Sequence, residues 1–120
     1  MSLCLIGAAT ARIVTAAFTL TWLHSIEHTR WEEDWAVNGD RLQLVEARIE
    51  SMGAGMETPS DATFDGVWWR WTPKREPMRE VLLRRSDSQP QGWRLCAGGS
   101  CRPVADADEK ADVVTMKACD

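Results

Sequence analysis

Hydrophobic and polar residues alternate along much of the chain with a period of two residues. In residues 18–25 the large aromatic side chains fall at even positions, and therefore on one face of an extended strand. That face carries Phe18, Leu20, Trp22 and His24. The pattern predicts a half-buried β-strand and places His24 in line with three core residues.

The next segments predict a β-hairpin. Residues 31–37 repeat the alternation, and the face that continues the core carries Trp31, Glu33, Trp35 and Val37. Asn38-Gly39-Asp40 follows, and these residue types tolerate the positive φ of a tight turn. Residues 41–50 are predicted to form the return strand, with Leu42, Leu44, Glu46 and Arg48 on one face.

The register of this hairpin decides which charged groups meet. The preferred register pairs Val37 with Leu42, Trp35 with Leu44, Glu33 with Glu46 and Trp31 with Arg48. It gathers the charged groups on one face and gives Arg48 the Trp31 ring to lie against. A turn shifted to Asn38-Gly39 would instead put Glu33 opposite Leu44.

Further short strands are predicted wherever apolar or β-branched runs lie between Gly, Pro and small polar residues. They are residues 3–6 (an edge strand), 11–15, 64–71, 78–85, 93–96, 101–104 and 112–119. Pro73 and Pro77 predict a loop at residues 72–77. No segment has a sustained helical period. We therefore expect a single all-β domain over residues 1–120, a small antiparallel sandwich or barrel of about eight or nine short strands.

Composition narrows the classes of partner. The chain has 120 residues, 44% of them hydrophobic, which is enough for a core. Its net charge of −4 makes a nucleic-acid backbone an unsuitable partner. No apolar run is long enough to span a membrane. Residues 1–11 lack a basic leading segment, so they predict a first strand rather than a signal peptide, and by default a cytoplasmic protein.

The four cysteines point to a different compartment. Cys96 and Cys101 lie opposite each other across a predicted Gly98-Gly99 turn, at a separation that a disulfide can bridge. Cys4 and Cys119 lie on the first and last strands, which could be neighbours. Disulfides would indicate an oxidising compartment such as the periplasm, so compartment stays open. A zinc site is disfavoured by the Cys96–Cys101 spacing and by the lack of a second close pair.

Four ionisable residues fall on predicted inward faces: His24, Glu33, Glu46 and Arg48. A buried carboxylate must pair, bind something or stay protonated. The cluster is therefore either a satisfied structural network or a binding site, and both interpretations remain open. An enzyme with Glu33 and Glu46 as acid and base, assisted by His24, is a further alternative.

Metal and nucleophile chemistry fit the pattern poorly. His24, His28, Glu32 and Glu33 resemble ligands in one dimension, but the two histidines would share a face only in a helix. Ser25 and His24 point to opposite faces of a strand, and no nucleophile elbow surrounds Ser25. We expect no metal, no cofactor and no catalytic nucleophile.

A small-residue loop completes the candidate site. Gly53-Ala54-Gly55 permits a tight bend or a nest of backbone N–H groups. At His24-Ser25, Trp31-Glu32-Glu33 and Gly53-Ala54-Gly55-Met56 the sequence resembles the domain-of-unknown-function 1850 family of uncharacterised bacterial proteins. The resemblance extends over nearly the whole chain, including residues 93–96 and 98–101. The family's motif falls on His24, Ser25, Glu33, Gly53, Ala54 and Gly55; His28 stands where relatives often carry Lys.

The resemblance also implies a role. Genes of this family often lie beside those of TRAP transporters of the TAXI type, which import carboxylate solutes. It implies a non-enzymatic accessory domain that binds a small carboxylate or a transporter subunit. Arg48 would pair with the carboxylate, Glu33 would orient His24, and Trp31 with the Gly53–Gly55 backbone would line the site. A purely structural module with an exposed Trp68 is the third hypothesis.

Overall fold

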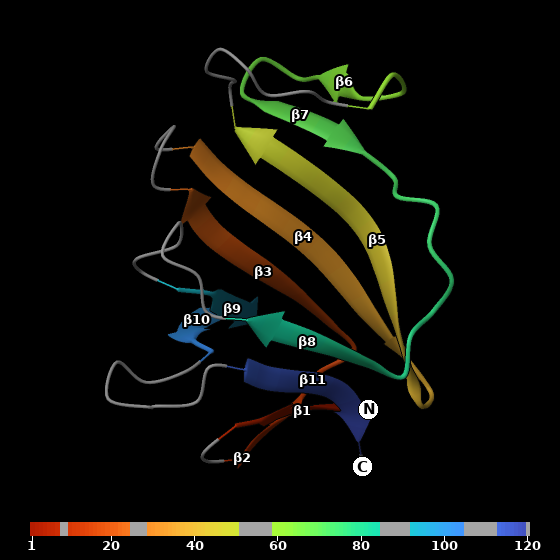
Figure 1. Ribbon diagram of the computed structural model, residues 1–120, viewed down its shortest axis with the longest axis vertical. Coiled ribbons are helices and arrows are strands. Elements are labelled where there is room, and N and C mark those ends of the chain that lie inside the picture. The colour runs from red at the N-terminus through yellow and green to blue at the C-terminus, as the bar shows by residue number, and fades with distance from the viewer. Residues whose placement is uncertain (8–9, 25–28, 51–58, 85–91, 105–112, 120) are drawn as a thin grey trace.

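The computed structural model describes residues 1–7, 10–24, 29–50, 59–84, 92–104 and 113–119 of the protein. These residues form eleven β-strands and no helix (Figure 1). The strands are β1 (Ser2–Ile6), β2 (Thr10–Val14), β3 (Ala17–His24), β4 (Thr29–Asn38), β5 (Arg41–Glu50), β6 (Thr63–Phe64), β7 (Trp68–Trp71), β8 (Glu80–Arg84), β9 (Arg94–Ala97), β10 (Ser100–Pro103) and β11 (Val113–Cys119). The all-β prediction is confirmed. None of the described residues forms a helix long and apolar enough to cross a membrane.

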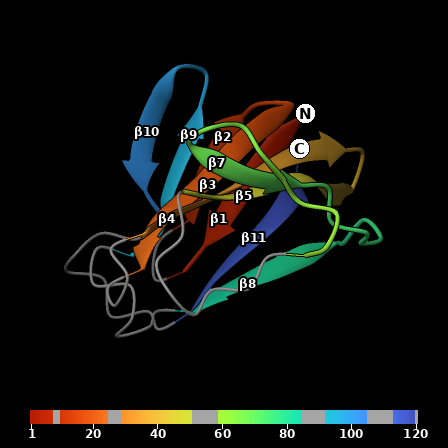
Figure 2. The ribbon, with the colours of Figure 1, turned by 90° about the horizontal axis from the view of Figure 1, so that it is seen from above.

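Two antiparallel sheets pack against each other in a sandwich-like arrangement (Figures 1 and 2). The larger sheet has the order β10-β9-β3-β4-β5-β7-β6, and the smaller has the order β2-β1-β11-β8. The prediction of an edge strand at residues 3–6 is wrong, because β1 lies between β2 and β11. The pairing joins the first strand to the last, a contact that no local sequence pattern encodes.

The core fills the space between the sheets at one end of the larger one. It contains Leu3, Leu5, Phe18, Leu20, Trp35, Val37, Leu42, Leu44, Leu83, Leu95, Val114, Met116 and Ala118. From β4 and β5 it takes only residues on the hairpin-turn side. Figure 1 shows the smaller sheet beside that end, while β6 and β7 lie at the other. We call the face of the larger sheet that meets this core the inner face.

A β-bulge interrupts the pairing of β4 with β5. Val37 pairs with Leu42 and Trp35 with Leu44, as predicted. Beyond this point the register shifts, so that Asp34 pairs with Glu46, Glu33 with Ala47, Glu32 with Arg48 and Trp31 with Ile49. Val45 is the extra residue and is 46% exposed. The predicted pairs Glu33–Glu46 and Trp31–Arg48 are therefore wrong.

The segment at residues 64–71, predicted as one strand, contains a turn. The Asp65 Oδ1 atom accepts hydrogen bonds from the backbone N–H groups of Val67 and Trp68, at 2.9 and 2.6 Å. Gly66 follows Asp65 with a φ of 104°, a conformation that favours glycine. The turn separates β6 from β7 and brings the total above the eight or nine strands expected.

Two disulfides join strands that are neighbours in the sheets. Cys96 on β9 pairs with Cys101 on β10 and bonds to it, which confirms the predicted bridge. Cys4 on β1 bonds to Cys119 on β11. The first and last strands are thus hydrogen-bonded and covalently linked.

Candidate functional site

The bulge at Val45 separates the charged groups that the sequence had placed together. Because side chains alternate between the faces of a strand, one extra residue moves everything after it to the opposite face. Ala47 and Ile49 are buried on the inner face, and Glu46 and Arg48 therefore lie on the outer face. Glu33 stays on the inner face, between Trp31 and Trp35 along β4. The expectation that Glu33, Glu46 and Arg48 converge is wrong.

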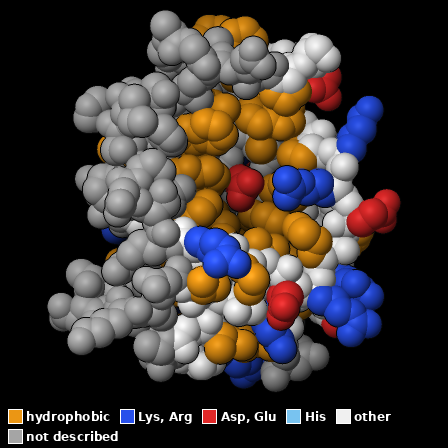
Figure 3. Space-filling view, in the orientation of Figure 1, with side chains coloured by type: hydrophobic (Ala, Val, Ile, Leu, Met, Phe, Trp, Pro, Cys, Tyr) orange, Lys and Arg blue, Asp and Glu red, His pale blue; other side chains and the backbone are white. Residues whose placement is uncertain are grey.

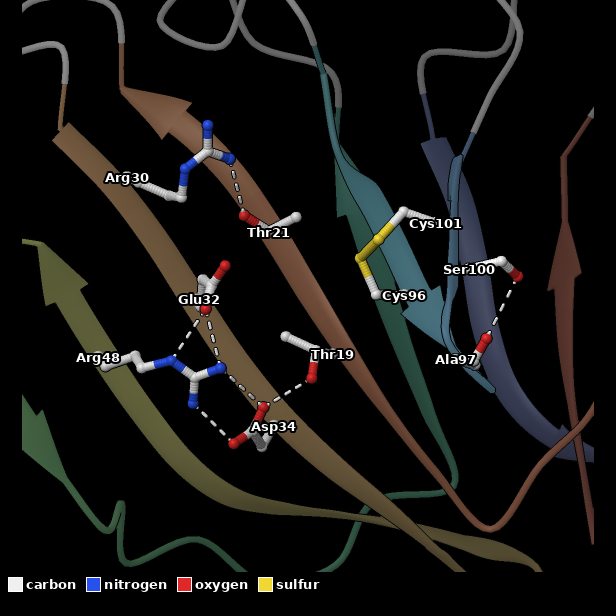
Figure 4. Close-up of a disulfide and its surroundings, with 10 residues drawn as sticks. All are labelled: Thr19, Thr21, Arg30, Glu32, Asp34, Arg48, Cys96, Ala97, Ser100 and Cys101. Carbon is white, nitrogen blue, oxygen red and sulfur yellow. Dashed lines mark hydrogen bonds and ion pairs between the residues drawn. A yellow bond between two sulfur atoms is a disulfide. The ribbon is translucent and has the colours of Figure 1, made fainter. Parts of the chain in front are cut away.

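On the outer face, Arg48 is surrounded by three carboxylates, of which Figure 4 shows those of Glu32 and Asp34. Its Nε donates to Glu32 Oε1 at 2.9 Å, and its Nη1 donates to Asp34 Oδ2 at 2.6 Å and to Glu46 Oε2 at 2.8 Å. Its Nη2 lies 3.1 Å from Asp34 Oδ1 and 2.8 Å from Glu32 Oε1. These five contacts match the five N–H groups of a guanidinium. Arg48 therefore has no donor left for the carboxylate of a ligand.

The surroundings of Asp34 and Arg48 hold both side chains in their charged forms. Burial opposes ionisation of Asp34, but hydrogen bonds from Arg48 and Thr19 outweigh it and lower the pKa of this carboxyl. Burial likewise opposes the charge on Arg48, yet the carboxylates of Asp34 and Glu32 raise its pKa. The Arg48 guanidinium also lies over the Trp68 ring, 5.6 Å from its centroid. This is the satisfied network of the structural interpretation.

The network continues to the edge of the sheet. Arg70 Nη1 donates to Glu46 Oε2 at 3.0 Å, and Arg70 Nε donates to Asp65 Oδ2 at 2.6 Å. Hydrogen bonds from the Trp68 backbone, from the Arg70 side chain and from the Val67 backbone lower the pKa of Asp65 to about 2. We call this set the carboxylate network; its members are Glu32, Asp34, Glu46, Arg48, Asp65 and Arg70.

The inner face of the same strands is aromatic. Trp22 pairs with Trp31, and Trp31 with Ile49, which pairs in turn with Trp69. The Trp22 ring lies 5.9 Å from that of Trp31 and 4.3 Å from that of Trp93. All of these indoles are half-buried, in contrast to Trp35, which is 3% exposed. We call this surface the aromatic face; it comprises Trp22, Trp31, Trp69, Trp71 and Trp93.

Glu33 lies beside the aromatic face in the next row of the sheet. It pairs with Leu20 on β3 and with Ala47 on β5, and Ala47 pairs with Trp71 on β7. Among β3, β4, β5 and β7, Glu33 is the one acidic residue that the pairing places on the inner face. Figure 3 shows this side of the molecule, where hydrophobic side chains gather and acidic and basic side chains lie among them.

The environment of Glu33 disfavours its charge. Burial raises the pKa of this carboxyl, while the Trp35 indole and the charge of Arg75 oppose the shift. The Trp35 Nε1 atom, however, completes no hydrogen bond of ordinary geometry with a described residue. Beyond the Trp35 indole and the charge of Arg75, no hydrogen bond or ion pair within the described residues acts on Glu33. Glu33 is thus a half-buried carboxylate without the compensation that Asp34 receives.

The comparisons with known proteins identify the family. The family model for a domain of unknown function, DUF1850, matches residues 18–104, which is more than half of the chain. The chain belongs to the DUF1850 family. Searches of curated proteins and of solved structures found no match.

The other site residues predicted for this DUF1850 domain remain apart from Glu33 or lie outside the described residues. His24 pairs with Thr29, and Glu33 with Leu20, four residues away along β3. That is about 13 Å along a strand, with the Trp22–Trp31 pair between them. The structure therefore does not bring Glu33 to His24. Ser25, Gly53, Ala54 and Gly55 lie outside the described residues.

The acid–base alternative loses its geometry in this DUF1850 domain. Glu33 and Glu46 lie on opposite faces of the sheet, so they cannot act as an acid–base pair on one substrate. Among the residues that the structure describes, no three His, Cys, Asp or Glu side chains are grouped as metal ligands. Sequence reasoning missed Asp34, Arg70 and the inner-face indoles of β7. A signal existed: the apolar positions change from even at Leu42 and Leu44 to odd at Ala47 and Ile49.

Proposed function

We propose that this DUF1850 domain is a non-enzymatic binding domain that holds a small solute against the aromatic face, beside Glu33. The observation that carries the proposal is the burial of the Glu33 carboxylate on the inner face. Burial of this carboxylate, which the Trp35 indole and the charge of Arg75 only partly offset, costs folding free energy that a neutral or apolar residue at that position would not. Such a cost is common where a residue serves binding rather than stability.

The contrast between the two faces supports this choice of site. On the outer face every donor of Arg48 contacts a carboxylate of the chain itself, as expected of a structural network. On the inner face the indoles are half-buried, and the described groups that offset the burial of Glu33 are the Trp35 indole and the charge of Arg75. Half-buried indoles offer broad apolar surface together with an N–H donor, which suits the recognition of small organic molecules.

The same proposal includes the physiological setting that the resemblance implies. The domain would serve a TAXI-type TRAP transporter as an accessory that holds a solute or contacts a transporter subunit. The two disulfides support an oxidising compartment such as the periplasm, where such a solute is captured. The role of Arg48 as the solute-binding cation is dropped, because its donors are occupied.

The test uses the seven indole N–H groups as reporters. Protein labelled with ¹⁵N is titrated with succinate, glycine betaine and choline, which represent anionic, zwitterionic and cationic solutes. We expect at least one of them to shift the signals of Trp31, Trp69 and Trp71 and to leave that of Trp68 in place. Trp68 lies on the same strand as Trp69 and Trp71 but faces the carboxylate network.

Matched variants assign the effect to a face. Trp71→Leu should weaken binding by about tenfold, since an aromatic contact with a bound solute contributes about 1 kcal/mol or more. Trp68→Leu, the control on the opposite face, should leave binding unchanged. The proposal fails if no solute of the three shifts the inner-face indoles at millimolar concentration, or if Trp68 responds as strongly as Trp71.

A further inference from the structure

The arrangement around Glu33 specifies more than a surface for solutes. Glu33, Ala47 and Trp71 form one row across β4, β5 and β7 on the inner face. Ala47 ends in a methyl group, so the two large side chains of the row stand on either side of a small one. The strands are spaced about 4.8 Å apart, which puts the carboxylate-bearing and indole-bearing positions about 10 Å from each other.

That spacing suits a positively charged group between a carboxylate and a ring. An ammonium ion contacts a carboxylate at about 4 Å and attracts an aromatic face within about 6 Å of its centroid. Trp31 precedes Glu33 by two residues on the same face, and Trp69 precedes Trp71 in the same way. A cation held by Glu33 would therefore meet aromatic side chains in two neighbouring rows.

Charge complementarity selects the occupant. The described groups that act on Glu33 are its neighbours Leu20 and Ala47, which carry no charge, the Trp35 indole, and Arg75 of the segment between β7 and β8. An anion would meet the negative charge of the carboxylate, which Arg75 offsets only in part. A neutral apolar molecule would leave the carboxylate desolvated and unpaired. A cation in contact with the carboxylate supplies the close counter-ion that the described residues do not provide.

We propose that the aromatic face recognises a small alkylammonium group, with Glu33 as its counter-ion and Trp71 and Trp31 as its aromatic partners. This inference rests on the proposed function and adds the class of ligand. A quaternary or protonated amine, alone or as the positive end of a zwitterion, satisfies it. Its recognition would combine an ion pair with cation–π contacts in a partly desolvated site.

The experiment compares choline with its uncharged carbon analogue, in which a tert-butyl group replaces the trimethylammonium group. Both are titrated into the wild-type protein at neutral pH, with indole N–H shifts and tryptophan fluorescence as readouts. We expect choline to bind at least about tenfold more tightly than the analogue, because shape is conserved and only the charge differs. Glu33→Gln should remove this preference, and Glu33→Asp should restore part of it.

Glu50→Gln provides the matched control. Glu50 lies on β5 and pairs with Trp68, on the outer face, so this variant removes one negative charge without changing the aromatic face. It should bind choline as the wild-type protein does. The inference is overturned if choline and its analogue bind equally, if Glu33→Gln keeps the preference, or if only succinate binds. Binding of succinate or of the uncharged analogue alone would leave the proposed function standing; binding of none of the probes would remove both.

Discussion

Glu33 and Asp34 are neighbours in the chain, yet their carboxyl pKa values shift in opposite directions. Both lose water on folding, but Asp34 gains hydrogen bonds from Arg48 and Thr19, whereas Glu33 gains no ordinary hydrogen bond within the described chain. The bulge decides this outcome, because it carries Arg48 to the side of Asp34. At the scale of single residues, the cost of Glu33 is what distinguishes the candidate site from the structural network.

Replacing Glu33 should therefore stabilise the protein. Its pKa is higher in the folded than in the unfolded chain, so its ionisation penalises the folded state once the pH exceeds the unfolded value, near 4.5. We expect Glu33→Gln to raise the free energy of unfolding by roughly 1 kcal/mol at neutral pH. The gain should vanish below about pH 4, where the carboxyl is protonated in both states.

Urea unfolding of the wild-type protein and of the Glu33→Gln variant at a series of pH values measures this difference in the free energy of unfolding. Glu50→Gln, which changes a carboxylate on the outer face, should show no comparable gain at neutral pH. A loss of stability in Glu33→Gln at neutral pH would mean that the ionised carboxylate has a stabilising partner. The premise of the proposed site would then be wrong.

At the scale of strands, alternation predicted much of the larger sheet. The strand at residues 41–50, the turn at Gly39-Asp40 and the Cys96–Cys101 pair are confirmed. These features depend on residues close in sequence, where side-chain period and turn chemistry act directly. The bulge was missed because the prediction assumed one unbroken period through residue 48. The change from even to odd apolar positions between Leu44 and Ala47 is its signature in the sequence.

Deleting Val45 tests the function of the bulge. Without Val45, Leu44 is followed directly by Glu46, and regular alternation then keeps Glu46 and Arg48 on the outer face and Arg48 beside Asp34. We therefore expect the deletion to cost no more than about 2 kcal/mol and to leave the fold intact. Circular dichroism and thermal unfolding measure the loss.

Val45→Ala is the control for this deletion, since it keeps the chain length. Val45 is 46% exposed, so its substitution should cost less than about 1 kcal/mol. A deletion variant that is largely unfolded would show that the sheet needs the local twist that the bulge gives to β5. The separation of the two faces would then depend on the bulge and not only on which residues pair.

At the scale of the whole molecule, the last strand, β11, pairs with the first strand, β1. β1 lies between β2 and β11, and the Cys4–Cys119 disulfide spans 115 residues, whereas Cys96–Cys101 spans five. Alternation could predict the individual strands of the smaller sheet but not their order, because pairing between distant segments depends on packing of the complete core. The Cys4–Cys119 disulfide therefore joins two strands whose pairing the local sequence could only suggest.

The two disulfides should differ in their effect on stability. A cross-link restricts the unfolded chain in proportion to the logarithm of the loop it closes. On this basis, replacing Cys4 and Cys119 by Ser should cost about 5 kcal/mol, and replacing Cys96 and Cys101 about 2 kcal/mol. Denaturant unfolding of the two double variants measures the difference. Equal losses would indicate that the unfolded chain already holds its first and last strands together. Unfolding of the Cys4–Cys119 variant at ambient temperature would instead tie the fold to an oxidising compartment.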